Sequence, residues 1–216
     1  MYEVILFDLD GTLTDPKIGI TLSVQYALER MGIHEENPDS LTPFIGPPLL
    51  ESFMEFYHMS HEEAVQAIVY YRERFSKVGL YENKVYPGIS ELLAALKEQG
   101  KKLIVATSKP TEFSVKILEH FALKEFFHAI IGSNLDGSRT DKSDVIQFAL
   151  LEEGSCDRDK IVMVGDRKYD VIGARQNGID GIAVAYGYGS DEELADANPK
   201  YIASSVEELT DFLLKK

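Results

Sequence analysis

Short apolar runs that alternate with helical patterns are the feature that most limits what this 216-residue chain can fold into. Most of the runs are rich in β-branched residues, which favours buried strands. Strands and helices in alternation predict right-handed βαβ units, and therefore an α/β fold with a doubly wound, mainly parallel sheet covered on both faces. The predicted strands are Val4–Leu9, Leu103–Thr107, Ala129–Gly132, Ile161–Val164 and Ile182–Ala185.

The connection between the first two predicted strands is far longer than one crossover needs. Its pattern predicts helices. The first covers residues 16–31, with Asp15 as its N-cap, and the second covers Leu49–Tyr57. A third begins at Ser60, where Glu63 completes a capping box, and continues to about residue 78.

These helices predict a small helical cap domain at residues 15–82. The cap is inserted into a Rossmann-like α/β core made of residues 1–14 and 83–216. Both hinges fall near the C-terminal end of the first strand, which is the edge where open α/β sheets bind ligands. We therefore expect the cap to act as a lid.

The charge balance limits the partners of the chain. Asp and Glu number 36 against 22 Lys and Arg, so the formal net charge is −14. A surface this acidic repels phosphate backbones, and we expect neither nucleic-acid polymers nor anionic membranes as partners. The apolar run at Val4–Phe7 is too short for a signal peptide or a membrane span. The single cysteine, Cys156, excludes an internal disulfide and suits a reducing, cytoplasmic location.

Two carboxylates stand at the end of the first predicted strand. Strand side chains alternate, so Asp8 and Asp10 point to the same side while Leu9 points away. Two carboxylates this close repel each other unless a cation or a proton intervenes, which indicates metal binding together with acid/base chemistry. Gly11 lets the chain turn and lets backbone N–H groups approach an anion. Taken alone, the pair is equally consistent with an acidic loop.

Three further strand ends carry polar groups. Thr107 and Ser108 end the second strand ahead of a helix, a place suited to phosphate oxygens. Lys142 begins a later helical pattern. Asp166 ends the fourth strand, and Asp170 returns to the same face in the first helical turn. Each signal is weak alone, but four loops after parallel strands supply Asp/Asp, Thr/Ser, Lys and Asp/Asp in order, which indicates one shared site.

This ordered set resembles the haloacid dehalogenase-like hydrolase superfamily over essentially the whole chain. The long helical insert is similar to that of the branch that contains phosphoglycolate phosphatases and β-phosphoglucomutases. The stretch Gly132–Lys142 looks most like bacterial members that are 5′-nucleotidases. The matching signatures are Asp8-Leu9-Asp10-Gly11-Thr12-Leu13, Thr107-Ser108, Lys142, and Gly165-Asp166 with Asp170.

The resemblance implies a phosphatase of small phosphorylated metabolites that uses Mg²⁺ and a phosphorylated aspartate. Asp8 would attack phosphorus in line, and Asp10 would protonate the leaving alcohol and then deprotonate water. Mg²⁺ would be held by the Asp8 carboxylate, the Asp10 backbone carbonyl and Asp166, with Asp170 acting directly or through water.

The resemblance also implies how the phosphate is bound. Thr107, the Ser108 backbone and the turn at Gly11 would hold its oxygens, and Lys142 would offset the charge of Asp8 and the phosphate. The stretch similar to 5′-nucleotidases favours a nucleoside 5′-monophosphate over phosphoglycolate as the substrate. Arg139 and Arg167 are expected near the site mouth. Phe44, Phe53 or Tyr71 are candidates to stack on a nucleoside, although the pattern favours packing of Tyr71 within the lid. Arg72 or Arg74 is the candidate to bind the carboxylate of phosphoglycolate, although the pattern favours solvated side chains for both.

Other functions remain open at this stage. A phosphomutase needs the same aspartates but keeps water away until a sugar phosphate accepts the phosphoryl group. A dehalogenase does not use the Asp10 acid/base or the metal pair, and a phosphonate hydrolase needs a lid lysine, for which Lys17 is the nearest residue. Outside the enzymes, a phosphate-binding or phospho-aspartate signalling module shares the acidic residues but lacks a large lid. The pattern does not predict an oligomeric state.

One glycine pair has no assigned role in this chemistry. Gly187-Tyr188-Gly189 follows the last predicted strand, but the third glycine of a dinucleotide-binding motif is missing, so we predict a turn. Ser190 and Glu193 then predict a capping box for the next helix.

Overall fold

The computed structural model describes residues 1–154 and 156–215. The chain divides into two compact units. Pro16–Lys84 form one unit, and Met1–Asp15 together with the chain from Val85 onward form the other. The predicted domain boundaries, between residues 14 and 15 and between residues 82 and 83, lie one and two residues before the boundaries of these units.

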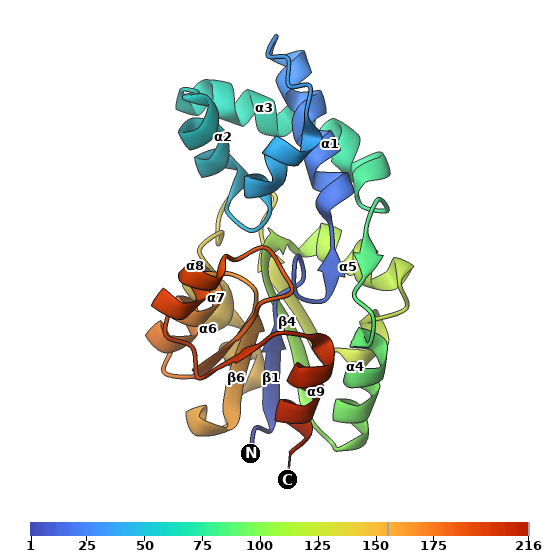
Figure 1. Ribbon diagram of the computed structural model, residues 1–216, viewed down its shortest axis with the longest axis vertical. Coiled ribbons are helices and arrows are strands. Elements are labelled where there is room, and N and C mark those ends of the chain that lie inside the picture. Colours follow the sequence, from blue (N-terminus) through green and yellow to red (C-terminus); the bar gives the residue numbers. More distant parts are fainter. Residues whose placement is uncertain (155, 216) are drawn as a thin grey trace. The chain divides into compact units, whose positions relative to one another are not determined.

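A parallel six-stranded sheet forms the centre of the α/β unit, with strand order β5-β4-β1-β6-β7-β8 (Figure 1). β1 lies between β4 and β6, and its residue Val4 is in register with Lys102 on one side and Ile161 on the other. All four residues of β1 are buried, as expected for a parallel strand that is covered on both faces. The strands are β1 (Val4–Phe7), β4 (Lys102–Pro110), β5 (Ala129–Ser133), β6 (Ile161–Gly165), β7 (Asp180–Val184) and β8 (Tyr201–Ala203).

The predicted fold class is therefore confirmed, and each of the five predicted strands is present. The strand β8 was not predicted, because its apolar stretch Tyr201–Ala203 is only three residues long. Two-residue strands β2 (Thr14–Asp15) and β3 (Lys84–Val85), which pair where the chain passes between the units, were also missed.

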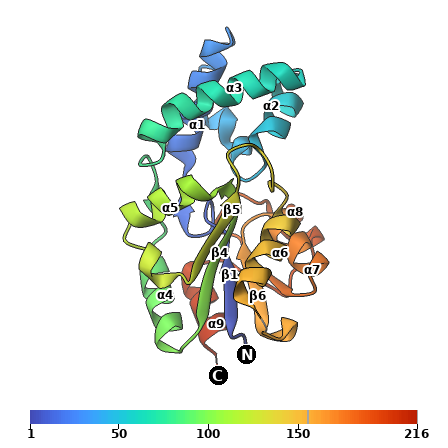
Figure 2. The same ribbon diagram turned by 180° about the vertical axis from the view of Figure 1, so that it is seen from behind.

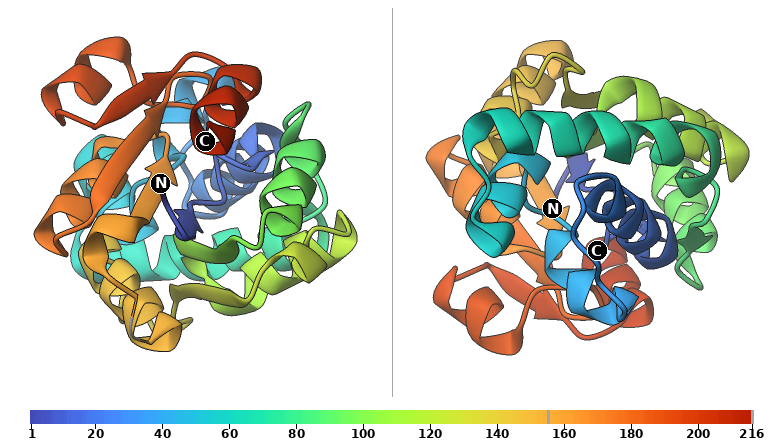
Figure 3. Two further views of the ribbon diagram at one scale, coloured as in Figure 1. Left: turned by 90° about the horizontal axis from the view of Figure 1, so that it is seen from below. Right: turned by 90° about the horizontal axis from the view of Figure 1, so that it is seen from above.

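Helices cover both faces of this sheet (Figure 2). α6 and α7 pack on the face that carries Val4 and Leu6, where they form one apolar cluster with β4 and β6. α4 and α9 lie side by side on the other face, as the view along the strands shows (Figure 3, left). The helices of this unit are α4 (Ile89–Glu98), α5 (Thr111–His120), α6 (Lys142–Glu153), α7 (Lys168–Gln176), α8 (Asp191–Asp196) and α9 (Val206–Leu214), with short 3₁₀ turns at Lys124–Phe126 and Arg158–Lys160.

The inserted unit is helical. It contains α1 (Lys17–Arg30), a 3₁₀ segment (Pro38–Phe44), α2 (Leu49–Tyr57), α3 (His61–Arg74) and a π-helical turn (Phe75–Gly79). α1 packs against α3 and the 3₁₀ segment. The three predicted helices are present, whereas the 3₁₀ segment was not predicted because Pro38 and Pro43 break the helical pattern.

The helix starts in this unit gave one correct and one wrong prediction. Ser60 Oγ accepts a hydrogen bond from the Glu63 backbone at 3.3 Å, and Glu63 accepts one from the Ser60 backbone at 2.8 Å, so the capping box is confirmed. Asp15 does not cap α1. Its carboxylate instead accepts a hydrogen bond from the Tyr188 hydroxyl, and Pro16 is the N-cap residue.

The aromatic rings expected to stack on a nucleoside lie inside the helical unit. Phe44, Phe53 and Tyr71 are 3%, 0% and 5% exposed. Phe44 packs edge-on against Phe53 at 5.0 Å between ring centroids, and Tyr71 stacks on Phe75 at the same separation. Burial argues against the stacking role for all three rings, because a small helical unit needs its largest apolar side chains for its own core. The favoured interpretation of Tyr71, packing within the lid, is confirmed.

None of the helices within residues 1–154 and 156–215 combines the length and the apolar character that crossing a bilayer requires.

Candidate active site

The candidate site lies at the carboxyl edge of the sheet. Asp8 follows β1 directly, Asp166 follows β6, and Thr107 lies in β4. β1 lies between β4 and β6 in the sheet, so these strand ends are brought together. Lys142, the first residue of α6, and Asp170, in the first turn of α7, complete the group. All five side chains are buried, which is unusual for the four ionisable ones and indicates a site rather than a solvated surface.

Lys142 holds two of the carboxylates. Its Nζ donates a hydrogen bond to Asp8 Oδ1 at 2.7 Å and lies 2.9 Å from Asp170 Oδ1. It also donates to the backbone oxygen of Ala106 at 3.2 Å. Burial alone would lower the pKa of Lys142, but the charges of Asp170 and Asp8 outweigh burial and raise it. The lysine is therefore a permanent cation beside Asp8.

Three carboxylates in this group offer a cation site. Oxygens of Asp8, Asp166 and Asp170 lie within 4.8 Å of one another. Lys142 neutralises one of their three negative charges, so the buried group keeps an excess of two. Burial raises the pKa of Asp166 well above its usual range, and the charges of Asp8 and Asp170 raise it further. A divalent cation that prefers oxygen ligands, such as Mg²⁺, matches both the donor set and the missing charge.

Asp166 is fixed by two groups that were not predicted as part of the site. Tyr188 donates its backbone N–H to Asp166 Oδ2 at 2.8 Å, and Thr12 Oγ1 donates to Asp166 Oδ1 at 3.3 Å. A Cβ on Gly11 or Gly187 would lie 2.1 to 2.3 Å from Asp166 atoms, so these two positions have no room for a side chain. The turn predicted for residues 187–189 is present, and the glycine pair in it was the signal of a close approach.

Asp10 has a partner that was also missed. Lys109 Nζ donates to Asp10 Oδ2, and both side chains are nearly buried. Asp10 Oδ1 is buried and has no hydrogen-bond partner in the described parts of the chain. Burial raises the pKa of Asp10, although Lys109 opposes the shift. Lys109 stands directly after Ser108 in the sequence, but only the irregular end of β4, between Ala106 and Pro110, turns it toward Asp10.

The family assignment rests on this arrangement and on the sequence. The haloacid dehalogenase-like hydrolase family model matches residues 5–184. The chain belongs to this family. The resemblance inferred from the four loops is thereby confirmed, and the match begins in β1 and ends in β7.

Several known proteins resemble this hydrolase along nearly its whole length. A 5′-nucleotidase of Pseudomonas aeruginosa is 49% identical, over 98% of this chain and 96% of its own length. The tyrosine-protein kinase PtkA of Mycobacterium tuberculosis is 38% identical over 98% of this chain and 72% of its own length. A phosphoglycolate phosphatase of Vibrio cholerae is 26% identical over 98% of this chain and 97% of its own length. The crystal structure of a predicted phosphatase from Clostridium acetobutylicum superposes with a TM-score of 0.96, at 52% identity over 99% of both chains.

The phosphate-binding residues of the hydrolase stay predictions. Thr107 is 2% exposed, and its Oγ1 accepts a hydrogen bond from the Lys109 backbone at 3.3 Å. Ser108 is half-buried. Their position at the end of β4, next to β1, is compatible with holding phosphate oxygens near Asp8.

Arg139 has partners within its own part of the chain. It donates to the Gly132 backbone oxygen at 2.9 Å and to Asn134 Oδ1 at 3.1 Å, and its guanidinium lies 4.4 Å from the Phe148 ring centroid. Its φ of 56° makes it one of the non-glycine residues in the left-handed region. These contacts give it a role in shaping the loop before α6, and its role in substrate binding stays a prediction.

Arg167 is bound by Glu193. Two of its nitrogens donate to the two Glu193 oxygens at 2.8 and 3.2 Å. Ser190 caps α8 as predicted, with its Oγ accepting from the Glu193 backbone at 3.1 Å. The second half of that capping box was wrong, because the Glu193 carboxylate binds Arg167 and the Lys168 backbone instead. Arg167 as a substrate ligand stays a prediction.

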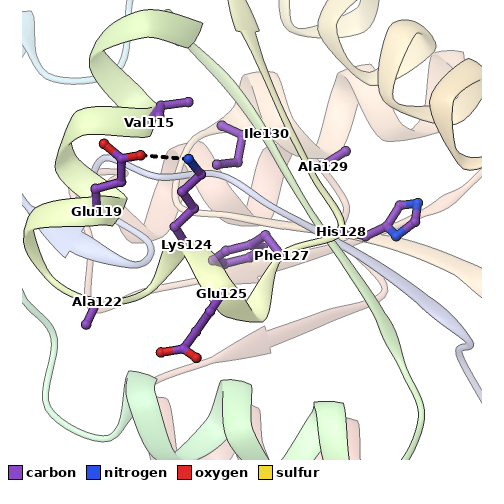
Figure 4. A pocket seen from close by; sticks show the side chains of 9 residues that line it. All are labelled: Val115, Glu119, Ala122, Lys124, Glu125, Phe127, His128, Ala129 and Ile130. Atoms are coloured by element: carbon purple, nitrogen blue, oxygen red, sulfur yellow. Dashed lines mark hydrogen bonds and ion pairs between the residues drawn. The ribbon is translucent and has the colours of Figure 1, made fainter.

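A separate pocket of about 690 Å³ lies beside the edge strand β5 (Figure 4). The Lys124–Glu119 ion pair, at 2.6 Å, stands at this pocket. None of the predicted catalytic residues lines it, so it is distinct from the candidate site. Its lining residues are Val115, Glu119, Ala122, Lys124, Glu125, Phe127, His128, Ala129 and Ile130.

Proposed function

We propose that this phosphatase hydrolyses small phosphate monoesters through a phosphorylated Asp8, with Mg²⁺ held by Asp8, Asp166 and Asp170. One observation carries the proposal, namely a buried trio of carboxylates, two of which, Asp8 and Asp170, pair with the same lysine, Lys142. Burying three carboxylates is costly unless cations compensate them, and the chemistry of a phosphate dianion is what requires the cations. When bound, Mg²⁺ supplies positive charge that offsets the carboxylates and the phosphoryl oxygens.

Asp8 is the nucleophile in this proposal. Lys142 fixes its Oδ1, which limits the directions in which the carboxylate can point. A carboxylate oxygen of Asp8 attacks phosphorus, and the bond between phosphorus and the ester oxygen breaks. The leaving oxygen takes a proton from Asp10 and departs as an alcohol.

Asp10 completes the second half of the cycle. It takes a proton from water, the water oxygen attacks the phosphorus of the aspartyl phosphate, and inorganic phosphate leaves with Asp8 restored. Burial favours the protonated form of Asp10, which suits an acid that must first donate. The ion pair with Lys109 gives the Asp10 carboxylate a defined orientation.

For the substrate, we propose a nucleoside 5′-monophosphate. The relative that is 49% identical is a 5′-nucleotidase, and at that identity over nearly full length a shared substrate class is the simplest expectation. The buried positions of Phe44, Phe53 and Tyr71 remove the stacking argument, so the preference rests on the relative.

Phosphoglycolate is the second candidate substrate, because phosphoglycolate phosphatases are also among the relatives. Its carboxylate needs a cation of its own, and Arg74 was one candidate. Arg74 instead makes two hydrogen bonds to Glu82, at 2.7 and 3.0 Å, and a third to Ser23 at 3.2 Å. This engagement disfavours Arg74 as the ligand of that carboxylate and leaves Arg72 as the remaining candidate.

A phosphate-release screen tests the function. Purified protein with Mg²⁺ is given p-nitrophenyl phosphate, several nucleoside 5′-monophosphates, sugar phosphates and phosphoglycolate, with Asp8→Asn run in parallel. We expect Asp8-dependent phosphate release and the highest kcat/KM for a nucleotide. A value for phosphoglycolate more than about tenfold above every nucleotide reverses the choice of substrate. Transfer of the phosphoryl group to a sugar phosphate without phosphate release contradicts the hydrolase assignment and favours a phosphomutase.

A further inference from the structure

The segment of residues 9–15, close after β1, carries Asp10 and accepts hydrogen bonds from residues elsewhere in the chain. Within the segment, the Gly11 backbone donates to the Thr14 oxygen at 2.7 Å, and the Thr14 backbone donates to the Leu9 oxygen at 3.0 Å. Three tyrosines then contact successive parts of it. The Tyr186 hydroxyl donates to the Thr12 oxygen at 3.0 Å, the Tyr86 backbone donates to the Leu13 oxygen at 3.1 Å, and the Tyr188 hydroxyl donates to the Asp15 carboxylate.

Tyr188 is the tyrosine that joins this segment to Asp166, and a hydrogen bond also links its side chain to that of Tyr86. Its backbone N–H holds Asp166, a proposed metal ligand, and its side chain holds Asp15. The turn that carries it fits closely on Asp166, because the Gly189 backbone donates to the Asp166 backbone oxygen at 3.1 Å and a Cβ on Gly189 would lie 2.2 Å from that oxygen. The turn therefore has little freedom to move, and the Tyr188 ring extends from a fixed base.

Asp15 is where such an attachment has most effect. It is the last residue of the α/β unit before the chain enters the helical unit. It also neighbours Thr14, which closes the turn onto Gly11 and forms a bridge with Asp10. A bond that fixes Asp15 therefore fixes the C-terminal end of the turn on which Asp10 sits.

We propose that Tyr188 is a positioning residue of this phosphatase. The bond from its hydroxyl to Asp15 holds segment 9–15 in the conformation that sets the Asp10 carboxylate beside Asp8. The inference rests on the proposed function, since only that chemistry makes Asp8 and Asp10 the reacting groups. Tyr188 itself touches no reacting atom, and its ring and hydroxyl act through Asp15.

Tyr188→Phe removes the hydroxyl, with its bonds to Asp15 and to the Tyr86 side chain, and keeps the backbone N–H that holds Asp166. We expect kcat for p-nitrophenyl phosphate to fall about tenfold, since a slightly displaced catalytic group loses rate rather than binding. KM and the Mg²⁺ concentration that gives half-maximal activity are expected to stay within about twofold of wild type. Amide hydrogen exchange in residues 9–15 is expected to become faster.

Tyr201→Phe is the matched control. Tyr201 is also in the α/β unit, and its hydroxyl donates to a carboxylate, Glu208, at 2.6 Å. The same atom is lost there, so kcat and exchange in residues 9–15 are expected to match wild type. Asp15→Asn keeps an acceptor oxygen and is expected to retain activity, whereas Asp15→Ala is expected to reproduce Tyr188→Phe. The double variant Tyr188→Phe/Asp15→Ala is then no slower than either single variant.

Four results overturn the positioning role. The first is an unchanged kcat in Tyr188→Phe, and the second is a fall in Mg²⁺ affinity as large as the fall in kcat. The third is a loss of kcat in Tyr201→Phe equal to that in Tyr188→Phe. The fourth is a loss of kcat in the double variant equal to the product of the losses in the two single variants. Faster exchange with unchanged kcat also overturns it, because the segment is then held without consequence for the reaction. Phosphate release that survives Asp8→Asn contradicts the proposed function, whereas an Asp8-dependent enzyme indifferent to Tyr188→Phe contradicts only this inference.

Discussion

The carboxyl edge of the sheet and the inserted helical unit use their charged residues in different ways. At the sheet edge, the side chains of Lys142, Asp8 and Asp170 are 6%, 7% and 1% exposed. In the helical unit, the side chains of the Arg30–Glu73 pair are 45% and 41% exposed. Pairs near the surface cost little and contribute little, whereas a buried cluster with excess negative charge costs stability. A fold keeps such a cluster where chemistry needs it, which supports our proposal that the sheet edge is the reacting part of the molecule.

Replacing the nucleophile is expected to have the largest effect on activity. Asp8→Asn keeps the shape of the side chain but removes the attacking charge, so kcat should fall on the order of 10⁴-fold or more. The control is Asp144→Asn, which alters an exposed acid in the first turn of α6 and should leave kcat unchanged. Steady-state kinetics on both variants test this. A kcat of Asp8→Asn within about tenfold of wild type would contradict the role of Asp8 as the nucleophile.

Removing the metal is expected to abolish phosphatase activity without changing the structure of the helical unit. Activity should vanish in EDTA and return with Mg²⁺ but not with Ca²⁺, whose larger and looser coordination shell suits the site poorly. Mg²⁺ at about 100 times its Kd should also stabilise the wild type by about 2.7 kcal/mol. A thermal melt checks this, because Asp166→Asn and Asp170→Asn should lose the Mg²⁺-dependent rise in Tm. An unchanged metal response in both variants would place the cation elsewhere.

Two charge-removing variants compare the regions directly. Lys142→Met leaves Asp8 and Asp170 buried without their cation and should lower the free energy of unfolding by about 3–5 kcal/mol in the absence of Mg²⁺. Arg74→Met removes the partner of Glu82, a pair with 21% and 27% exposed side chains, and should cost about 1–2 kcal/mol. Urea denaturation measures both. Arg74→Met should keep kcat/KM for nucleotides, and a selective loss with phosphoglycolate would return Arg74 to the substrate.

The smallest expected effect lies at a helix cap in the inserted unit. Ser60→Ala opens the capping box of α3 and should cost about 1 kcal/mol of stability. Because the capping bonds stay within residues 60–63, kcat should match wild type. Thermal melts and kinetics measured on the same preparation test this, and a clear fall in kcat would show that the capping box of α3 affects the reaction.

Much of the site could be predicted because it depends on where parallel strands end. Asp8, Asp166 and Lys142 follow or begin regular elements, and the βαβ topology brings such ends together. Lys109 and Tyr188 could not be predicted in the same way. Lys109 reaches Asp10 only through the irregular end of β4, and Tyr188 reaches Asp166 through a turn whose fit depends on its glycines. Short-range irregularity of this kind leaves no periodic signal in a sequence.

The failures in the helical unit have a different cause. Phe44, Phe53 and Tyr71 were candidates for a ligand because large aromatic side chains suit both binding sites and cores, and pattern alone does not separate the two uses. Asp15 was assigned to a helix cap because the sequence places it at the start of α1, whereas its partner Tyr188 is far away in the chain. Sequence spacing describes local contacts and says little about which distant group competes for a side chain.

Trapping the phosphorylated enzyme tests the central claim most directly. Wild-type protein with Mg²⁺ and a nucleoside 5′-monophosphate is quenched in acid during turnover and digested, and the peptides are identified by mass spectrometry. We predict a phosphoryl group on Asp8, within the peptide that contains this residue, and no phosphorylated peptide from Asp8→Asn. Turnover that proceeds with no phosphorylated Asp8 at any quench time, or with the phosphoryl group on another residue, would contradict it.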